Sequence, residues 1–361
     1  MSAHRPSRPR RGILAGGNWI VDHVKVIDTW PPQDALASIL GQTASNGGAP
    51  YNVLKDLARL GAPFPLAGVG LVGRDVDGRA IRADCAACGI DVRRLRMTRL
   101  AATSSTDVMT VQSTGRRTFF HQRGANALLD AGDFDFAASR ARIFHLGYLL
   151  LLDRLDGADR GRPRVCRVLA AARRQGLKTS IDVVSEDSRR YRRVVLPALP
   201  FVDYCFANDF EAERLTGVRL RSRRGIVAAA AERAARRLLA AGVREWVFIH
   251  FAEAVLAAHA GGGCWWQPSV RVRPADIRGA AGAGDALAAG ILFGLHEGWP
   301  ITRCLRLGVA AAAASLSHPT CSEGVGTAAA CLAQAGRRGF RRLPGMNRRV
   351  AGARRRFAPA P

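Results

Sequence analysis

The sequence predicts an α/β protein whose central sheet is mostly parallel. Short apolar runs alternate with segments of helical apolar spacing along most of the chain, which is the order expected of strands joined by crossover helices. Several of these runs are apolar throughout, as strands covered on both faces are. Near the front of the chain, other runs alternate polar and apolar residues and do not fit that sheet. We therefore also expect a small two-sided β flap beside it.

The expected elements follow in chain order. A buried strand, a glycine break and an alternating strand occupy 12–30, and a further strand covers 37–44. The remaining strands are expected at 64–73, in a hairpin at 103–126, at 142–148, 178–184, 204–208 and 245–250, and in a hairpin at 254–268. Helices are expected at 47–61, 77–91, 164–175, 209–216, 226–241, 284–296 and 301–315. One large domain spanning 12–325 would hold them all, between a disordered basic tail at 1–11 and an Arg-rich tail at 326–361.

The net charge of +25 raises the question of a nucleic-acid partner. Lysine occurs only at Lys25, Lys55 and Lys178, so nearly all the positive charge is arginine, a bias that GC-rich codons produce without any binding role. Much of the charge also lies in the two tails. We therefore do not expect nucleic acid as a partner.

Eight cysteines are scattered through a chain that shows no signal peptide and no apolar run long enough to span a bilayer. Free thiols in a reducing cytoplasm are the expected state, with no membrane partner. The pair at Cys85 and Cys88 matches C-x-x-C, but no second pair completes a zinc site.

A glycine pattern at Gly68–Gly73 reads G-x-G-x-x-G, which would indicate a nicotinamide-dependent dehydrogenase if it joined a strand to a helix. The pattern lies inside an apolar strand, and a turn follows before any helix, so this alternative is disfavoured. No P-loop, G-x-S-x-G elbow or H-E-x-x-H motif is present.

The segment "GAAGAGD", at 279–285, directly precedes a helix and could form part of a catalytic site. Gly282, Ala283 and Gly284 leave backbone amides free at a helix N-terminus, where the helix dipole favours phosphate and developing negative charge. Asp285, in the first turn, could take a proton from an alcohol attacking that phosphate. Simple helix capping is the alternative.

Polar residues elsewhere favour a site. Asp22 follows the first strand, and Gly47, Gly48 and Asn52 open a second helix. Asn208 and Glu211 follow the strand at 204–208, at the carboxyl end where open α/β sheets bind ligands, and Glu211 could hold Mg²⁺ through water.

The order G-G-N-x-x-x-D, G-G-x-x-x-N, "FHQRGAN", N-x-x-E and G-A-G-D resembles the PfkB (ribokinase-like) family of carbohydrate and nucleoside kinases. The resemblance implies a ribokinase-like three-layer sandwich with a small β-sheet lid formed by about 22–45 and 103–123. It also implies phosphoryl transfer from Mg-ATP to a hydroxyl of a small sugar in the cytoplasm, and a homodimer formed through the lid.

The resemblance further implies a role for each site residue. Asp285 would be the base, and Gly282, Ala283 and Gly284 the anion hole. The substrate would contact Asp22, Gly47, Gly48, Asn52, Arg123 and Asn126, with a structural role in the turn that closes the lid hairpin as the alternative for the last two. The nucleotide would contact Asn208, His250, Ala252, Glu253 and His318, and Glu211 would serve the metal.

Two departures from the family pattern qualify these expectations. The family's D-T-x-G-A-G-D begins here with Gly279, which makes K⁺ activation doubtful, and the family's T-x-G turn is replaced by Ala252 and its neighbours. A nucleoside kinase and a non-catalytic sugar- or nucleotide-binding relative therefore remain alternatives to an ATP-dependent sugar kinase.

Overall fold

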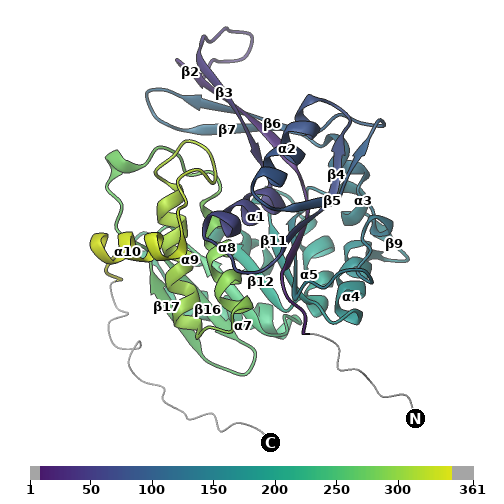
Figure 1. The fold of residues 1–361 in the computed structure, drawn as a ribbon. Helices are drawn as coiled ribbons and strands as arrows, with labels where there is room; N and C mark the ends of the chain where they lie inside the picture. The colour runs from purple at the N-terminus through teal and green to yellow at the C-terminus, as the bar shows by residue number, and fades with distance from the viewer. Residues whose placement is uncertain (1–8, 344–361) are drawn as a thin grey trace, which may run out of the picture.

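The computed structural model describes residues 9–343. Within them, the main sheet has nine strands in the order β17-β16-β15-β12-β11-β8-β1-β4-β5. The pairs from β5 to β15 are parallel, and β16 and β17 extend the sheet antiparallel (Figure 1). The strands are β1 (Ile13–Gly17), β4 (Leu66–Gly73), β5 (Asp91–Thr98), β8 (Ile143–Leu149), β11 (Lys178–Val183), β12 (Tyr204–Asn208), β15 (Trp246–His250), β16 (Ala254–His259) and β17 (Cys264–Pro268).

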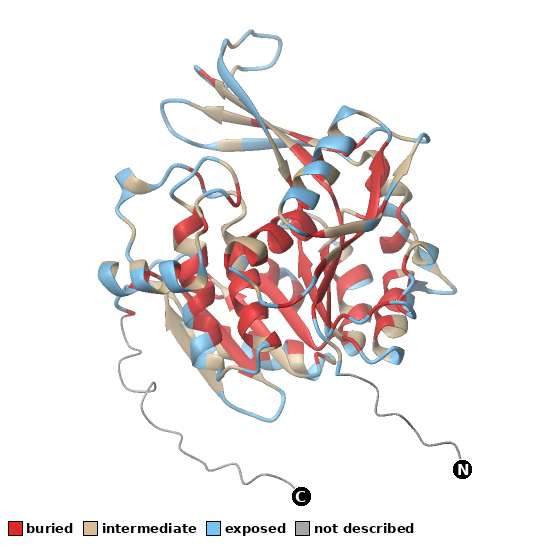
Figure 2. Cartoon of the chain, viewed as in Figure 1, coloured by how far each residue is buried: buried red, intermediate tan, exposed pale blue. Residues whose placement is uncertain are grey.

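Helices cover both faces of this sheet, because its strands are apolar on both sides. In β12, Cys205 and Ala207 join one buried cluster, while Tyr204 and Phe206 join the other. The first cluster packs under α3 (Asp153–Asp156), α4 (Val165–Arg174), α5 (Leu196–Ala198), α6 (Asp209–Thr216) and α7 (Ala228–Ala240). The second packs under α1 (Ala49–Arg59), α2 (Val76–Ala87), α8 (Ala283–His296), α9 (Ile301–Ser315) and α10 (Ala328–Arg338). The predicted three-layer α/β class is confirmed (Figure 2).

The lid is a separate four-stranded sheet in the order β3-β2-β6-β7, which projects from the body of the molecule (Figure 1). Its strands are β2 (Ile20–Ile27), β3 (Ile39–Gly47), β6 (Ser104–Val111) and β7 (Arg117–Gln122), close to the predicted lid segments. Two short hairpins lie elsewhere: β9 (Ala158–Asp159) with β10 (Arg162–Pro163), and β13 (Arg221–Ser222) with β14 (Gly225–Ile226). Short 3-10 or π segments lie at Gly124–Leu128, Ala131–Asp133, Tyr191–Val195, Leu199–Phe201 and Pro274–Asp276.

The glycine pattern at Gly68–Gly73 lies within β4, and α2 begins only after its N-cap Asp75. The glycines let the indole of Trp19 lie against the strand, where Trp19 Nε1 donates to the carbonyl oxygen of Val69 at 3.0 Å. A β-carbon at Gly68 would lie 2.7 Å from that indole. The pattern therefore serves packing, and the geometry a dinucleotide fingerprint needs is absent from it.

The predicted boundary between domain and C-terminal tail at residue 325 is too early. Residues 328–338 form α10, which buries Cys331 and Ala335 against the core and begins at a Thr327 cap. At the other end, the Arg10 side chain donates to the carbonyl oxygen of Ser139 at 2.8 Å, so the first described residues also contact the domain. The rest of the two predicted tails, 1–8 and 344–361, lies outside the described residues.

Candidate active site

The candidate site lies where the carboxyl ends of the parallel strands meet the N-termini of two helices. Asp285 is in the first turn of α8, and Asn52 is in the first turn of α1. Tyr148 lies near the end of β8, Asp182 lies near the end of β11, and β12 leads into α6 at Asn208. A doubly wound sheet collects polar side chains at this edge, since all its parallel strands end there.

Asp285 is 1% exposed and is held from two sides. Asn52 Nδ2 donates to Asp285 Oδ2 at 2.8 Å, and the Tyr148 hydroxyl lies 2.7 and 2.6 Å from Oδ1 and Oδ2. Burial raises the pKa of Asp285 to about 6, partly offset by these two donors. The carboxyl group is therefore oriented and mostly ionised at neutral pH, as a general base must be.

The amides expected to form an anion hole lie at the start of α8. Gly282 is the N-cap residue with φ 76, and Ala283 and Gly284 begin the helix. A β-carbon at Gly282 would lie 2.5 Å from that of Cys321, so only glycine fits between the helix and this loop. Near Gly284 lies the His250 imidazole, whose pKa burial lowers to about 4, leaving it neutral. The helix N-terminus thus presents free amides without a competing carboxylate cap.

Asp22 faces the same region from the lid. Its carboxyl group packs directly against Gly47, where no side chain intervenes. Burial raises the pKa of Asp22 to about 6, and the charge of Asp285 adds to the effect. Gly48 is the N-cap of α1, with φ 93, and brings Asn52 to the site one turn later. The structure thus brings Asp22, Gly47, Gly48, Asn52 and Asp285 together.

Glu211 and Asn208 form a capping box at the start of α6. The Asn208 side chain accepts from the Glu211 amide at 2.9 Å, and the Asn208 amide donates to Glu211 Oε2 at 2.8 Å. Ser185 Oγ donates to Glu211 Oε1 at 2.7 Å. Burial raises the pKa of Glu211 to about 7, with the nearby charges of Asp209 and Asp285 adding to it.

Several predicted contact residues have hydrogen-bond or ion-pair partners within the protein. Asn126 is fully buried, and its side-chain amide accepts from the Trp19 backbone nitrogen at 3.2 Å and donates to the Trp19 carbonyl oxygen at 3.1 Å. Arg123 donates to the carbonyl oxygen of Leu150 at 2.8 Å. Glu253 forms a two-pronged ion pair with Arg221, at 2.9 Å for both contacts. Asn126 and Arg123 thus anchor the segment that follows the lid, and Glu253 anchors the turn between β15 and β16.

The two other residues assigned to the nucleotide lie at the rim. Ala252 is exposed in the turn between β15 and β16. His318 is also exposed, and its Nδ1 lies 2.8 Å from the Thr320 hydroxyl. Neither is enclosed with Asp285.

Sequence reasoning missed three acidic or phenolic groups of the site. Tyr148 binds Asp285 directly. The pKa of Asp182 is raised well above its usual range by burial and by the charges of Glu211 and Asp285. Asp56, one turn after Asn52, is fully buried, and its pKa is also strongly raised by burial. Tyr148 and Asp182 stand at the ends of predicted strands, the same signal that singled out Asn208.

Comparison with known families decides the assignment. The model of the pfkB family of carbohydrate kinases matches residues 18–328, most of the chain. The chain belongs to the pfkB family of carbohydrate kinases. This confirms the resemblance deduced from the five motifs.

Two curated relatives are 5-dehydro-2-deoxygluconokinases. The protein from Geobacillus thermodenitrificans is 44% identical over 54 residues, and that from Geobacillus kaustophilus is 43% identical over 56. These matches cover 15% and 16% of this chain and only 16% and 17% of the relatives.

Solved structures share the fold of this pfkB-family chain at low identity. A ribokinase from Arabidopsis thaliana, solved with ribose and ATP, is 21% identical with a TM-score of 0.73, over 90% of this chain and 99% of that one. A nucleoside kinase from Methanocaldococcus jannaschii is 14% identical with a TM-score of 0.70, over 91% of this chain and 100% of that one. A putative ribokinase II from E. coli, solved with ATP and Mg²⁺, is 20% identical with a TM-score of 0.70, over 90% of this chain and 99% of that one.

Proposed function

We propose that this pfkB-family protein transfers the γ-phosphoryl group of ATP to a hydroxyl group of a small carbohydrate. The observation that carries the proposal is the buried Asp285, held by Asn52 and Tyr148 in the first turn of α8, beside the free amides of Gly282 to Gly284. A base next to an anion-binding helix N-terminus suits attack by an alcohol on a phosphate.

In this proposal, the substrate hydroxyl donates its proton to Asp285. The carboxylate still has lone pairs free for that proton, because Asn52 and Tyr148 occupy only part of its acceptor capacity. The amides at Gly282–Gly284 stabilise the negative charge that develops on the transferring phosphoryl group. Asp22 and the backbone at Gly47 and Gly48 hold the neighbouring hydroxyl groups, and the lid excludes water.

The residues present suit a magnesium ion bound mostly through phosphates and water. Asp182 and Glu211 are two buried carboxyl groups, and the charge of Glu211 raises the pKa of Asp182. Among residues 9–343, no group of three or more histidine, cysteine, aspartate or glutamate side chains could hold a metal. One or two carboxylates plus phosphate oxygens are a common Mg²⁺ ligand set. When bound, the ion would neutralise phosphate charge, and Glu211 and Asp182 would hold it.

Potassium is not part of the proposal. A β-carbon at Gly279 would lie 2.8 Å from the carbonyl oxygens of both His318 and Pro319. The loop thus occupies the space that an aspartate at this position would need, and we expect equal turnover with and without K⁺.

A screen for ADP release with Mg-ATP and a panel of acceptors tests the proposal. The panel should contain ribose, fructose, 5-dehydro-2-deoxygluconate and nucleosides, with and without K⁺. We expect acceptor-dependent ADP release with a sugar or sugar acid. Turnover with nucleosides alone would identify a nucleoside kinase, and binding of ATP without turnover on any acceptor would favour a non-catalytic relative.

The helices of residues 9–343 include none with the length and apolar character of a membrane span. We propose a cytoplasmic location for the protein.

A further inference from the structure

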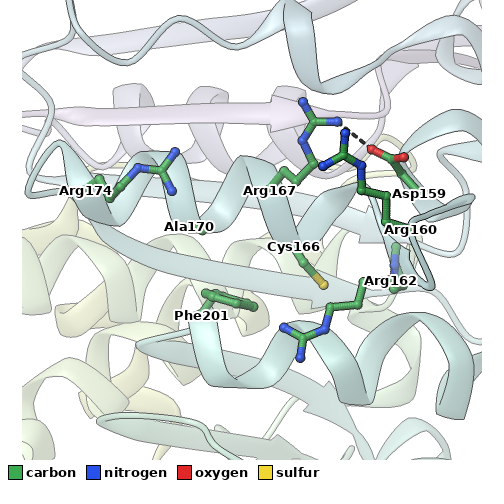
Figure 3. A pocket seen from close by; sticks show the side chains of 9 residues that line it. Asp159, Arg160, Arg162, Cys166, Arg167, Ala170, Arg174 and Phe201 are labelled. Carbon is green, nitrogen blue, oxygen red and sulfur yellow. Dashed lines mark hydrogen bonds and ion pairs between the residues drawn. The ribbon is translucent and has the colours of Figure 1, made fainter.

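A second cavity lies on the other helical layer, outside the candidate active site. It is bounded by α4, by the β9–β10 hairpin and by Phe201, and has a volume of about 530 Å³ (Figure 3). That volume is within the usual range for small-ligand pockets. None of its lining residues belongs to the candidate active site.

Local structure brings four arginines to this cavity. On α4, Arg167 and Arg174 lie seven residues apart, two helical turns, so their side chains share a face. Arg160 and Arg162 flank Gly161 in the turn between β9 and β10. Arg160 has φ 50, an uncommon backbone conformation for a residue with a side chain, next to Gly161 with φ 80. Figure 3 shows the Arg160 side chain beside Arg167, and the Arg162 side chain on the other side of Cys166.

The positive charge of the cavity is poorly compensated. Asp159 is its only lining carboxylate among the described residues, and it pairs with Arg167 at 2.6 Å. Within 9–343, no ion pair or hydrogen bond engages the guanidinium groups of Arg160, Arg162 and Arg174. A basic hollow elsewhere differs, because there Asp276 contacts both Arg273, at 2.8 Å, and Arg338, at 3.5 Å.

The floor of the cavity is apolar. Phe201 is half-buried, Cys166 is 4% exposed, and Pro163 and Ala170 complete the surface beneath the arginines. Burial raises the pKa of the Cys166 thiol, which therefore contributes as an apolar group. A ligand that fits must carry negative charge at one end and an apolar, preferably flat, body at the other. Guanidinium groups bind phosphate in a two-pronged fashion, so phosphate is the anion they suit best.

We propose that this cavity binds a small organic phosphate, with the phosphate among Arg160, Arg162, Arg167 and Arg174 and the apolar body on Phe201. The site goes beyond the proposed phosphoryl transfer, since it shares no residue with that reaction. It gives the protein a second ligand site on the opposite face of the sheet.

Calorimetric titration of the full chain with phenyl phosphate tests the site, with hydrogen exchange to locate the probe. We expect protection of residues 158–174. Arg162→Gln with Arg174→Gln should raise the Kd by at least about tenfold, as expected for losing charge-assisted hydrogen bonds. These two arginines have no protein partner here, so folding should be unchanged. Phe201→Leu should remove the preference for phenyl phosphate over inorganic phosphate.

Arg233→Gln with Arg236→Gln, on the outer face of α7, is the matched control, because it removes the same charge elsewhere. Equal weakening by both double variants would overturn the proposal, since binding would then follow net charge alone. Protection confined to the α8 N-terminus, or no saturable binding, would also overturn it. So would a single-stranded oligonucleotide that displaces the probe and binds more tightly per phosphate, because that would indicate a nucleic-acid surface.

Discussion

A single hydrogen bond from Tyr148 lowers the pKa of Asp285, the candidate base. The Tyr148 hydroxyl donates to the Asp285 carboxylate and so offsets part of the effect of burial, and the resulting pKa of Asp285 is about 6. The ionised form is the active one, so activity falls as pH drops through this value. Tyr148→Phe removes the donor and should move the acid limb of kcat/KM upward by about one to two pH units, the equivalent of a hydrogen bond to a charged group.

The check is a pH profile of both proteins from about pH 5 to pH 9 on the acceptor found by the screen. Tyr191→Phe is a suitable control, because the Tyr191 hydroxyl donates to the carbonyl oxygen of Val184 and not to Asp285. An acid limb that stays in place in Tyr148→Phe would contradict the assignment of Asp285 as the titrating base.

Residues at the site were predictable from the sequence when a motif marked them. Asp285, Asn52 and Asp22 stand in glycine-rich helix starts or after a strand, and the structure places them together. Asn126 stood in a similar motif, yet both ends of its amide bind the Trp19 backbone. Tyr148 ends a predicted strand, as Asn208 does, but it was not predicted, because nothing local indicates that this residue reaches a helix more than a hundred positions later.

At the scale of elements, Glu211 in the capping box of α6 has both a structural role and a proposed role in metal binding. Glu211 caps its own helix and also supplies a buried carboxylate beside Asp182. Glu211→Gln keeps an acceptor for the Asn208 amide but removes the negative charge. We expect the Mg²⁺ concentration for half-maximal rate to rise about tenfold or more, as for lost metal-site groups.

Titration of the initial rate with Mg²⁺ at fixed ATP measures this effect. The control is Glu213→Gln on the same helix, whose side chain accepts from the Leu220 amide. An unchanged Mg²⁺ dependence in Glu211→Gln would remove this residue from the metal role.

The loop at 317–324 packs tightly over the segment before α8. Gly279 is buried under the carbonyl oxygens of His318 and Pro319, whereas Ala280 is exposed. Gly279→Asp should therefore lower the free energy of unfolding by about 1–3 kcal/mol through overpacking. Urea unfolding, with Ala280→Asp as the control, measures it. A stable Gly279→Asp variant that gains activation by K⁺ would show that the loop yields and that the site accepts the cation.

Among the elements that were not expected from the sequence, β5 and α10 were missed for different reasons. β5 is an edge strand rich in arginine, and only Leu95 is buried, so its alternation is masked by long charged side chains. α10 lies in an Arg-rich region that composition assigned to a tail. Its apolar face is made of alanines, Cys331 and Leu332, a weak signal, and the helix is stabilised by packing on the core.

At the scale of the whole molecule, the order of strands and helices was predictable because parallel strands are apolar throughout and crossover helices separate them. The pairing order of the nine strands was not predictable, since chain order does not specify which strands are neighbours. The lid was recognised as a separate sheet by its alternation. Its parallel β2–β6 pairing joins segments some eighty residues apart and appears only in the structure.

The lid leaves large apolar side chains exposed, including Phe119, Phe120, Trp30, Ile39 and Leu40. Such a patch on an open sheet suits an interface, and we propose a homodimer formed through the lid. Phe119→Ser with Phe120→Ser should yield a monomer by light scattering, while Val76→Ser, at an exposed apolar residue on α2, should not. A wild-type protein that is monomeric at all accessible concentrations would contradict the proposal.

The most direct test of the account is the turnover of Asp285→Asn with Mg-ATP and the acceptor found by the screen. Asparagine keeps one oxygen that can accept from Asn52, and its NH2 group can donate to the Tyr148 hydroxyl. Its neutral side chain also avoids ionisation of a buried group. The variant should therefore fold at least as stably as the wild type at pH 8 and still bind ATP. We predict that kcat falls by roughly 10²–10⁴, the size of a general-base contribution. An unchanged kcat in a folded, ATP-binding variant would contradict the central claim that Asp285 is the base.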